Sequence, residues 1–245
     1  MPRMPAPWLI QGTAVHAAIE VWEDSFRQAP EDAVLAAYEE SWEAEESKAW
    51  EREPDPAGWQ RSGMKKVETD LSDRRIRGRD QVLTYMEETV KEALVPWILP
   101  DTGWVATEVS FEEDFGGVLV KGFIDLILQD KNTKAFLVRD IKTGTKKPVG
   151  NFQLKTYSIA MRRKYGIDIE WGDYWMCKDG APTAPEFLGG VPEEAVIAQY
   201  QILAEMDEGE MYGANIGEHC ARCDVAKHCP FVGGEPPKGI AFLGT

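Results

Sequence analysis

The sequence of 245 residues predicts an α/β (α+β) fold, in which a central mixed β-sheet is flanked by helices and preceded by a helical N-terminal region. Two observations predict this class. Apolar residues recur at helical spacing over most of residues 13–95. After Asp101-Thr102-Gly103 they give way to β-branched and aromatic runs separated by turn residues. A chain of this length favours one domain.

The first part of the chain contains three helical patterns, which assign residues 1–100 to a helical region. The first helix follows Gly12, with Thr13 as its expected N-cap. The second covers about residues 32–53, and the third runs from about residue 71 to residue 95, before Pro96 and Pro100 interrupt the pattern. Residues 31–55 contain ten acidic and two basic residues, which is typical of a solvent-exposed helix face.

The central part, residues 101–212, contains the strands. Runs over residues 104–114, 118–128 and 135–141 predict an antiparallel meander, because glycine and Asp-Lys-Asn turn signals separate them. A helix over residues 151–165, strands over 173–177 and 183–188, and a helix over 192–211 follow. Residues 213–245 hold a cysteine motif and a tail. We expect a cytoplasmic protein, because no membrane span or secretion signal is recognisable.

The hairpin between the second and third strands carries Asp125, Asp140 and Lys142. If its turn is centred between residues 131 and 132, Asp125 lies opposite Val138, and Asp140 lies one diagonal step away on the same face. Two carboxylates that share a divalent cation beside an ammonium group suit phosphodiester hydrolysis. From the spacing alone, an Asp–Lys ion pair at a strand end explains these residues equally well.

Six short motifs in order resemble those of the PD-(D/E)XK nuclease superfamily, and in particular its RecB-like exonuclease branch. They are Gly12-Thr13-Ala-Val-His16, Glu108, Gly122-Phe-Ile-Asp125, Asp140-Ile-Lys142-Thr-Gly, Gln153-Leu-Lys-Thr-Tyr157, and Cys220-Ala-Arg-Cys223 with Cys229-Pro230. The resemblance extends from about residue 12 to residue 230. It implies a restriction-endonuclease-like core, with residues 101–212 as the catalytic part of one nuclease domain.

The resemblance also implies roles for these residues in a deoxyribonuclease that depends on Mg²⁺ or Mn²⁺. His16, Asp125 and Asp140 resemble metal ligands, Lys142 the catalytic lysine, and Glu108 an acidic residue that supports the site. Gln153 and Tyr157 share one face of a helix, where they could contact the metal-bound water or DNA. Without the resemblance, His16 would be read as a helix histidine with a local hydrogen bond, and Tyr157 as a core residue.

The net charge of −15 is unusual for a DNA-binding enzyme, because Lys and Arg normally neutralise the DNA phosphates. Basic residues are concentrated in residues 139–164, where eight Lys and Arg accompany one acidic residue. We therefore expect DNA to bind along this segment, with Lys146, Lys147 and Lys155 beside Gln153 and Tyr157.

Cys220, Cys223 and Cys229 resemble the C-terminal part of the iron–sulfur site in RecB-like nucleases of the CRISPR-adaptation and phage type. They supply three of the four thiolates that a [4Fe–4S] cluster needs. The fourth ligand would be Cys177, a residue of another chain or a non-cysteine group. Our first interpretation is an incomplete cluster site, followed by Zn²⁺ with His219 or His228, and then by free thiols. An upstream start codon that restores a missing cysteine is a further hypothesis.

We thus expect an exonuclease that degrades linear DNA ends, single-stranded ends among them, in phage or bacterial DNA recombination or repair. The sequence has no P-loop motif, so unwinding would require a helicase or recombinase partner. A site-specific or structure-specific endonuclease is the alternative, because the same metal site serves both. A catalytically inactive DNA-binding or assembly module is a third possibility, but it gives no reason to retain His16, Asp125, Asp140 and Lys142.

Overall fold

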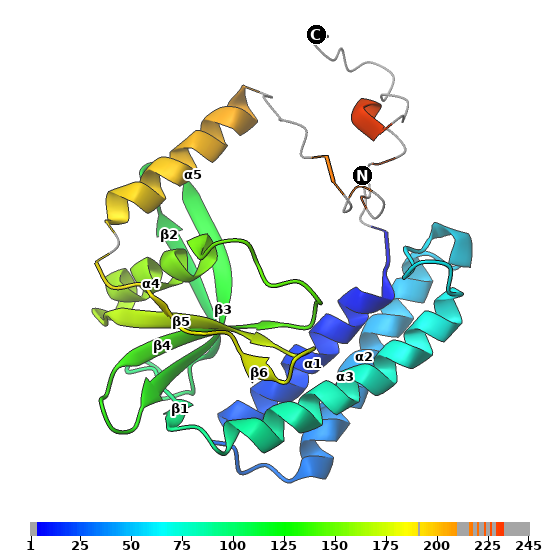
Figure 1. Ribbon diagram of the computed structural model, residues 1–245, viewed down its shortest axis with the longest axis horizontal. Helices are drawn as coiled ribbons and strands as arrows, with labels where there is room; N and C mark the ends of the chain where they lie inside the picture. Colours follow the sequence, from blue (N-terminus) through cyan, green and yellow to red (C-terminus); the bar gives the residue numbers. More distant parts are fainter. Residues whose placement is uncertain are drawn as a thin grey trace.

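The computed structural model describes residues 4–190, 192–209, 216–217, 220, 223, 226 and 229–232. It confirms the mixed α/β fold. One face of a curled, seven-stranded mixed sheet packs on three N-terminal helices, and the other face packs on α4 (Figure 1). Among the described residues, no helix combines the length and the apolar character needed to cross a membrane.

The helical layer contains α1 (Pro7–Asp24), α2 (Glu31–Arg52) and α3 (Val67–Thr89), with a short 3-10 turn, η1 (Pro56–Gly58), before α3. Their apolar faces enclose a core that includes Val15, Tyr38, Trp42, Val82 and Tyr85. Ile141 and Trp175 from the sheet are buried in the same core. The helical layer and the sheet are therefore one packed unit.

The start of α1 differs from the prediction. The helix begins at Pro7, and Thr13 is an interior residue whose hydroxyl donates a hydrogen bond to the Leu9 carbonyl. The prediction that Thr13 is the N-cap was therefore wrong. Proline is well suited to the first helical position, where its missing N–H has no intrahelical partner to lose.

The sheet contains β1 (Leu94–Pro96), β2 (Thr107–Asp114), β3 (Leu119–Asp130), β4 (Phe136–Lys142), β5 (Ile169–Met176), β6 (Ala181–Pro182) and β7 (Glu186–Phe187). Strand β3 pairs antiparallel with β1, β2 and β4, whereas β4 and β5 are parallel. The crossover between the parallel strands carries α4 (Phe152–Tyr165), and α5 (Glu193–Glu208) packs next to it. A final 3-10 turn is η4 (Pro230–Val232). The third helix was predicted to reach residue 95, but it ends at Thr89, and β1 follows.

The register of the β3–β4 hairpin differs by two residues from the prediction. Leu126 pairs with Arg139, so one further step along both strands brings Asp125 opposite Asp140 rather than opposite Val138. A shift of two residues leaves every side chain on its predicted face, because side chains alternate with a period of two.

The turn explains the shift. The Asp130 carboxylate accepts hydrogen bonds of 2.8 Å from the N–H groups of Asn132 and Thr133, and Lys134 adopts a left-handed φ of 66°. The connection therefore spans residues 131–135, and its centre lies farther along the chain than a two-residue turn would place it.

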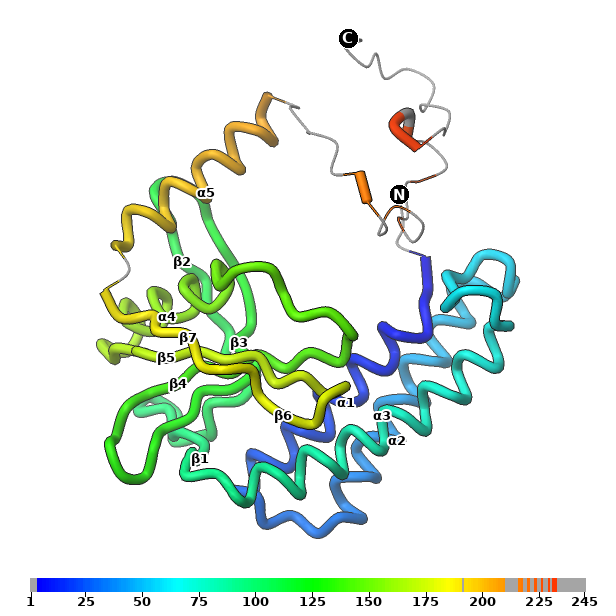
Figure 2. Tube along the Cα trace, viewed as in Figure 1, coloured from blue at the N-terminus to red at the C-terminus, as the bar shows by residue number. Residues whose placement is uncertain are grey.

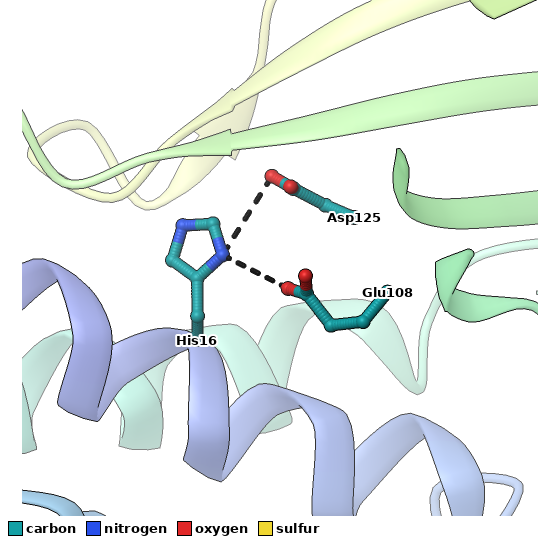
Figure 3. A group of neighbouring side chains, drawn as sticks. All are labelled: His16, Glu108 and Asp125. Atoms are coloured by element: carbon teal, nitrogen blue, oxygen red, sulfur yellow. Dashed lines mark hydrogen bonds and ion pairs between the residues drawn. The ribbon is translucent and has the colours of Figure 1, made fainter. Parts of the chain in front are cut away.

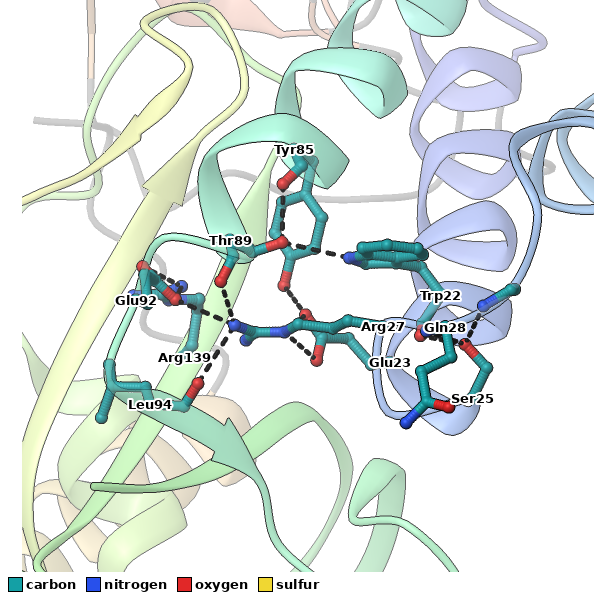
Figure 4. Close-up of polar contacts among 11 residues, drawn as sticks. Trp22, Glu23, Ser25, Arg27, Gln28, Tyr85, Thr89, Glu92, Leu94 and Arg139 are labelled. Atoms are coloured by element: carbon teal, nitrogen blue, oxygen red, sulfur yellow. Dashed lines mark hydrogen bonds and ion pairs between the residues drawn. The ribbon is translucent and has the colours of Figure 1, made fainter. Parts of the chain in front are cut away.

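Buried charges connect the helical layer to the sheet (Figure 4). Arg139 of β4 is fully buried and forms two hydrogen bonds with Asp173 of β5 and two with Glu92, which follows α3. Arg27, which follows α1, pairs with Glu23 and also with Glu92. Glu92 thus bridges two arginines and ties the ends of α1 and α3 to the centre of the sheet.

Candidate active site

His16, Glu108 and Asp125 meet where α1 contacts the sheet (Figure 3). His16 Nδ1 lies 3.4 Å from Glu108 Oε1 and 3.8 Å from Asp125 Oδ2. One ligand atom from each of the three residues lies within 4.8 Å of the others, so a single cation fits among them. Two carboxylates and an imidazole are a suitable donor set for Mn²⁺, and the oxygen ligands also suit Mg²⁺.

The main chain of Ile141 orients two of these side chains. Its N–H donates a 2.6 Å hydrogen bond to Asp125 Oδ2, and its carbonyl oxygen lies 3.1 Å from His16 Nε2. A proton on Nε2 is held by this carbonyl, which leaves Nδ1 to face the two carboxylates. Such a contact fixes the tautomer and orientation of a metal-binding histidine. Ile141 is the middle residue of the Asp-Ile-Lys motif, so the motif supports the site through its backbone as well.

Glu108 reaches the cluster because the β2 backbone bends at this residue. Its φ is 43°, in the left-handed region, although the residue is not a glycine. Thr107 and Val109 pair with β3 on either side of it. Backbone strain of this kind is concentrated at functional sites. The sequence predicted a supporting role for Glu108, but it contained no signal for this conformation, which brings the carboxylate into the ligand cluster.

Asp140 and Lys142 lie next to the cluster on β4 and form an ion pair, with Lys142 Nζ 2.5 Å from Asp140 Oδ2. The Asp140 side chain is buried, whereas that of Lys142 is partly exposed. The alternative that we derived from the spacing, an Asp–Lys ion pair at a strand end, is thus present. The three-residue ligand group does not include Asp140. Its role as a metal ligand stays a prediction.

Gln153 and Tyr157 form a chain of contacts that ends at Lys142. Lys142 Nζ lies 3.4 Å from Gln153 Oε1, and Gln153 Nε2 donates a 2.6 Å hydrogen bond to the Tyr157 hydroxyl. Tyr157 is buried and its ring packs edge-on against Phe111. The structure thus places Tyr157 behind Gln153, and its role as a DNA contact stays a prediction.

The charges of the cluster shift one another's pKa values. Burial lowers the pKa of His16, but the hydrogen bond to Glu108 and the charges of Asp125 and Glu108 outweigh it and raise this pKa to about 9. Burial raises the pKa of Asp125 to about 6, with a further contribution from Asp140 and a partial offset from His16. Burial also raises the pKa of Asp140, although Lys142 opposes the shift. A bound cation would favour the ionised carboxylates and the neutral imidazole.

A groove of about 1470 Å³ opens from His16 and Glu108. Its walls come from α1, α3, the loop after Lys142 and the turn after β5, so it lies between the helical layer and one end of the sheet. The groove gives an extended ligand access to the acidic cluster. No motif in the sequence indicated it, because its residues come from segments far apart in the chain.

The basic segment, residues 139–164, does not form the continuous surface that we expected. Arg139 is fully buried in the ion network, and Arg162 and Arg163 pair with Asp168 and Glu193 at the other end of α4. Arg139 is therefore not available to DNA, because alternate residues of a buried strand point into the core. DNA binding along the rest of the segment stays a prediction. Of the three lysines named as DNA contacts, Lys147 pairs with Glu186. The roles of Lys146, Lys147 and Lys155 stay predictions.

The predicted cysteine site is not assembled in the described part of the chain. Cys220, Cys223 and Cys229 form no disulfide, and they are absent from the group of described side chains that could share a metal. Cys177 is buried in the core formed with the N-terminal helices. His219 and His228 lie outside the described residues. The iron–sulfur cluster and the zinc ion at these cysteines stay predictions.

The mixed sheet and its cluster of carboxylates beside a lysine have the chemistry of a hydrolytic nuclease. The chain belongs to the PD-(D/E)XK nuclease superfamily, whose family model matches residues 5–230. It is 31% identical over 236 residues to the Gene 69 protein of Mycobacterium phage D29, covering 92% of this chain and 86% of that protein. The Gene 69 protein of Mycobacterium phage L5 is 28% identical over 253 residues, with the same coverage. The match to the family model confirms the superfamily, and the RecB-like iron–sulfur subgroup stays a prediction.

Proposed function

We propose that this protein is a metal-dependent DNA exonuclease that acts in phage or bacterial DNA recombination or repair. The convergence of His16, Glu108 and Asp125 beside Lys142 is the observation that carries this proposal. The three residues come from an N-terminal helix and two strands. A purely structural ion pair needs only two charged residues, so it does not explain why all three lie together.

Each residue of the site has a distinct part in this mechanism. His16, Glu108 and Asp125 would hold Mg²⁺ or Mn²⁺, with Asp140 as a further ligand. When bound, such an ion polarises the phosphate and lowers the pKa of a coordinated water. The Lys142 ammonium would orient the attacking water or stabilise the negative charge that develops on the phosphate. Gln153, in contact with both Lys142 and Tyr157, would keep this ammonium in place.

The contact chain from Tyr157 through Gln153 to Lys142 supports the exonuclease assignment, because the sequence resembles the RecB-like branch in these residues. The two Gene 69 relatives are phage proteins, which supports a role in phage DNA metabolism. Such an enzyme would work in the cytoplasm, with a helicase or recombinase partner where the DNA must be unwound.

The test compares linear DNA with covalently closed circular DNA as substrates, in Mg²⁺, in Mn²⁺ and in a chelator. We expect cleavage of the linear form alone, with complete dependence on the cation. Equal cleavage of circular DNA would identify the endonuclease alternative instead. An optical spectrum of the same sample tests for an iron–sulfur cluster at Cys220, Cys223 and Cys229 independently.

A variant separates catalysis from binding. We expect Lys142→Ala to lower the cleavage rate by a factor of about 10²–10³, with little change in DNA affinity. Lys48→Ala, which removes an exposed lysine on α2, is the matched control and should cleave at the wild-type rate. Wild-type activity in Lys142→Ala would contradict the proposed role, and inactivity of the wild-type protein would favour the DNA-binding or assembly module.

A further inference from the structure

The groove that contains His16 extends along one face of α1 and past Trp8 to Met4. Trp8, Gly12 and His16 follow one another at four-residue spacing, so they lie on the same side of the helix, and all three line the groove. The helix rises about 12 Å over these residues, since each residue adds ~1.5 Å. An indole therefore lies about two helical turns from the metal-binding cluster.

Trp8 is held in place by an anchored arginine. The Arg74 guanidinium lies 5.6 Å from the centre of the Trp8 ring. It is fixed by hydrogen bonds to Asp70, Gln11 and Ser62, at 3.0, 2.8 and 2.7 Å. Trp8 is half-buried, so part of the ring remains accessible in the groove. A ring that is already positioned loses little conformational freedom when a ligand stacks on it.

The opposite wall of the groove is a turn that packs on α3. Figure 2 shows the connection between β5 and β6 beside the N-terminal helices. Gly180 in this turn has a φ of 62°, and a Cβ there would lie 2.7 Å from Thr84 Cγ2, so the turn is close to the helix. Lys178 of the turn and Arg77 of α3 line the groove and are exposed. Within the described part of the chain, the side chains of Arg77 and Lys178 form no hydrogen bond or ion pair with another residue.

We infer that this groove binds single-stranded DNA, with one unpaired base stacked on Trp8 and phosphates beside Arg77 and Lys178. The inference rests on the proposed function, because the bound strand leads to the metal-binding cluster. Aromatic side chains in such grooves stack on the faces of unpaired bases, whereas the bases of a duplex cover one another.

The charge of the groove also favours a single strand over a duplex. Its described lining contains three Lys and Arg residues, Arg74, Arg77 and Lys178, and four acidic residues, Glu20, Asp80, Glu108 and Asp179. Duplex binding depends mainly on many basic contacts to phosphates, which this lining does not provide. Stacking adds affinity without added positive charge. A groove with one anchored indole and two available cations is therefore suited to a few unpaired nucleotides.

The binding test measures the fluorescence anisotropy of a short labelled single strand and of a blunt duplex of the same sequence, with Ca²⁺ as the cation. We expect Trp8→Ala to raise the Kd for the single strand about tenfold, and Trp8→Phe to restore most of the affinity. Gly12→Leu should have a similar effect to Trp8→Ala, because a Cβ at Gly12 already lies 3.4 Å from Thr143 Oγ1 and a larger side chain fills the groove. Trp104→Ala is the matched control, since this tryptophan is 74% exposed and is not part of the groove lining.

Hydrolysis of bis(p-nitrophenyl) phosphate in Mn²⁺ separates the groove from the metal site, because this phosphodiester contains no base. Trp8→Ala should hydrolyse it at the wild-type rate, while its KM for the single strand rises about tenfold. Wild-type affinity for the single strand in both Trp8→Ala and Gly12→Leu, or tighter binding of the duplex by the wild-type protein, would overturn the inference. If the wild-type protein hydrolyses neither DNA nor the small phosphodiester, the proposed function fails, and the anisotropy still decides whether the groove binds a single strand.

Discussion

His16 Nδ1 and Glu108 Oε1 lie 3.4 Å apart, although one residue belongs to α1 and the other to β2, 92 positions later in the chain. The contact depends on the left-handed φ of 43° at Glu108, which directs the carboxylate towards the helix. For a non-glycine residue, this conformation costs about 1–3 kcal/mol of backbone strain. The strained backbone and the carboxylate of Glu108 can therefore be tested separately by substitutions at this residue.

Two variants at residue 108 make this separation. Glu108→Gly and Glu108→Ala both remove the carboxylate, so both should bind Mn²⁺ at least tenfold more weakly in a calorimetric titration. Glycine tolerates the positive φ, whereas alanine does not, so without metal Glu108→Gly should be more stable by about 1 kcal/mol. Thermal unfolding in a chelator measures this difference. Equal stability of the two variants would show that the conformation is not strained.

The pKa values of the site predict how pH affects the stability of the metal-free protein. The pKa of His16 is raised from 6.5 to about 9, so the stability that it contributes is complete below pH 6.5 and is lost as the pH rises through 9. This contribution amounts to at most ~3 kcal/mol. The pKa of Asp125 is raised from 3.8 to about 6, so it also reduces stability as the pH rises, between about pH 4 and 6.

Mg²⁺ should reverse the trend, because it displaces the His16 proton and binds more tightly at higher pH. Thermal unfolding from pH 6 to pH 9, with a chelator and with Mg²⁺, measures both effects. The melting temperature should fall with pH in the chelator, and the stabilisation by Mg²⁺ should increase with pH. His16→Ala is the control, and a slope in the chelator as steep as that of the wild-type protein would exclude His16 as the cause.

The sequence predicted most of the fold, because periodicity depends on which faces are buried. The meander, the helix between the parallel strands and the common face of Asp125 and Asp140 on the hairpin are all present in the structure. The register was wrong by two residues, because Asp130 and Lys134 set the length of the turn through side-chain hydrogen bonds and a positive φ. Neither feature is visible in an apolar pattern.

Less of the candidate site could be predicted, because its geometry depends on long-range packing. The motifs identified His16, Asp125 and Lys142, which the structure brings to one region. They did not show that the Ile141 backbone orients two ligands, or that Arg139 is buried in an ion network. Local sequence gives the charge of a residue, but the direction of its side chain depends on partners far away in the chain.

Tyr157→Phe tests whether Tyr157 acts through Gln153 or contacts DNA. The variant keeps the ring but removes the hydroxyl, which accepts a 2.6 Å hydrogen bond from Gln153. Loss of this hydrogen bond frees the Gln153 amide beside Lys142. A hydrogen bond of this kind contributes about 1 kcal/mol of free energy. We expect kcat to fall about fivefold, with KM for DNA unchanged. Tyr165→Phe, which alters an exposed hydroxyl bonded to Asp101, should change neither parameter. A rise in KM with kcat unchanged would instead indicate direct DNA contact by Tyr157.

The last prediction concerns Arg139, which links the sheet to the ends of the N-terminal helices. Arg139→Met should destabilise the protein by about 3–5 kcal/mol, because it leaves the buried Asp173 carboxylate without its partner. The double variant with Asp173→Leu should recover much of this loss, since an apolar pair of similar volume replaces the charges. Arg75→Ala breaks partly exposed ion pairs and should cost at most about 1 kcal/mol. Because the same network holds α1 against the sheet, Arg139→Met should also weaken Mn²⁺ binding, which requires His16 to stay close to Asp125. Urea unfolding and metal titration measure the two effects, and a stable variant with wild-type metal affinity would mean that hydrophobic packing alone holds the helices in place.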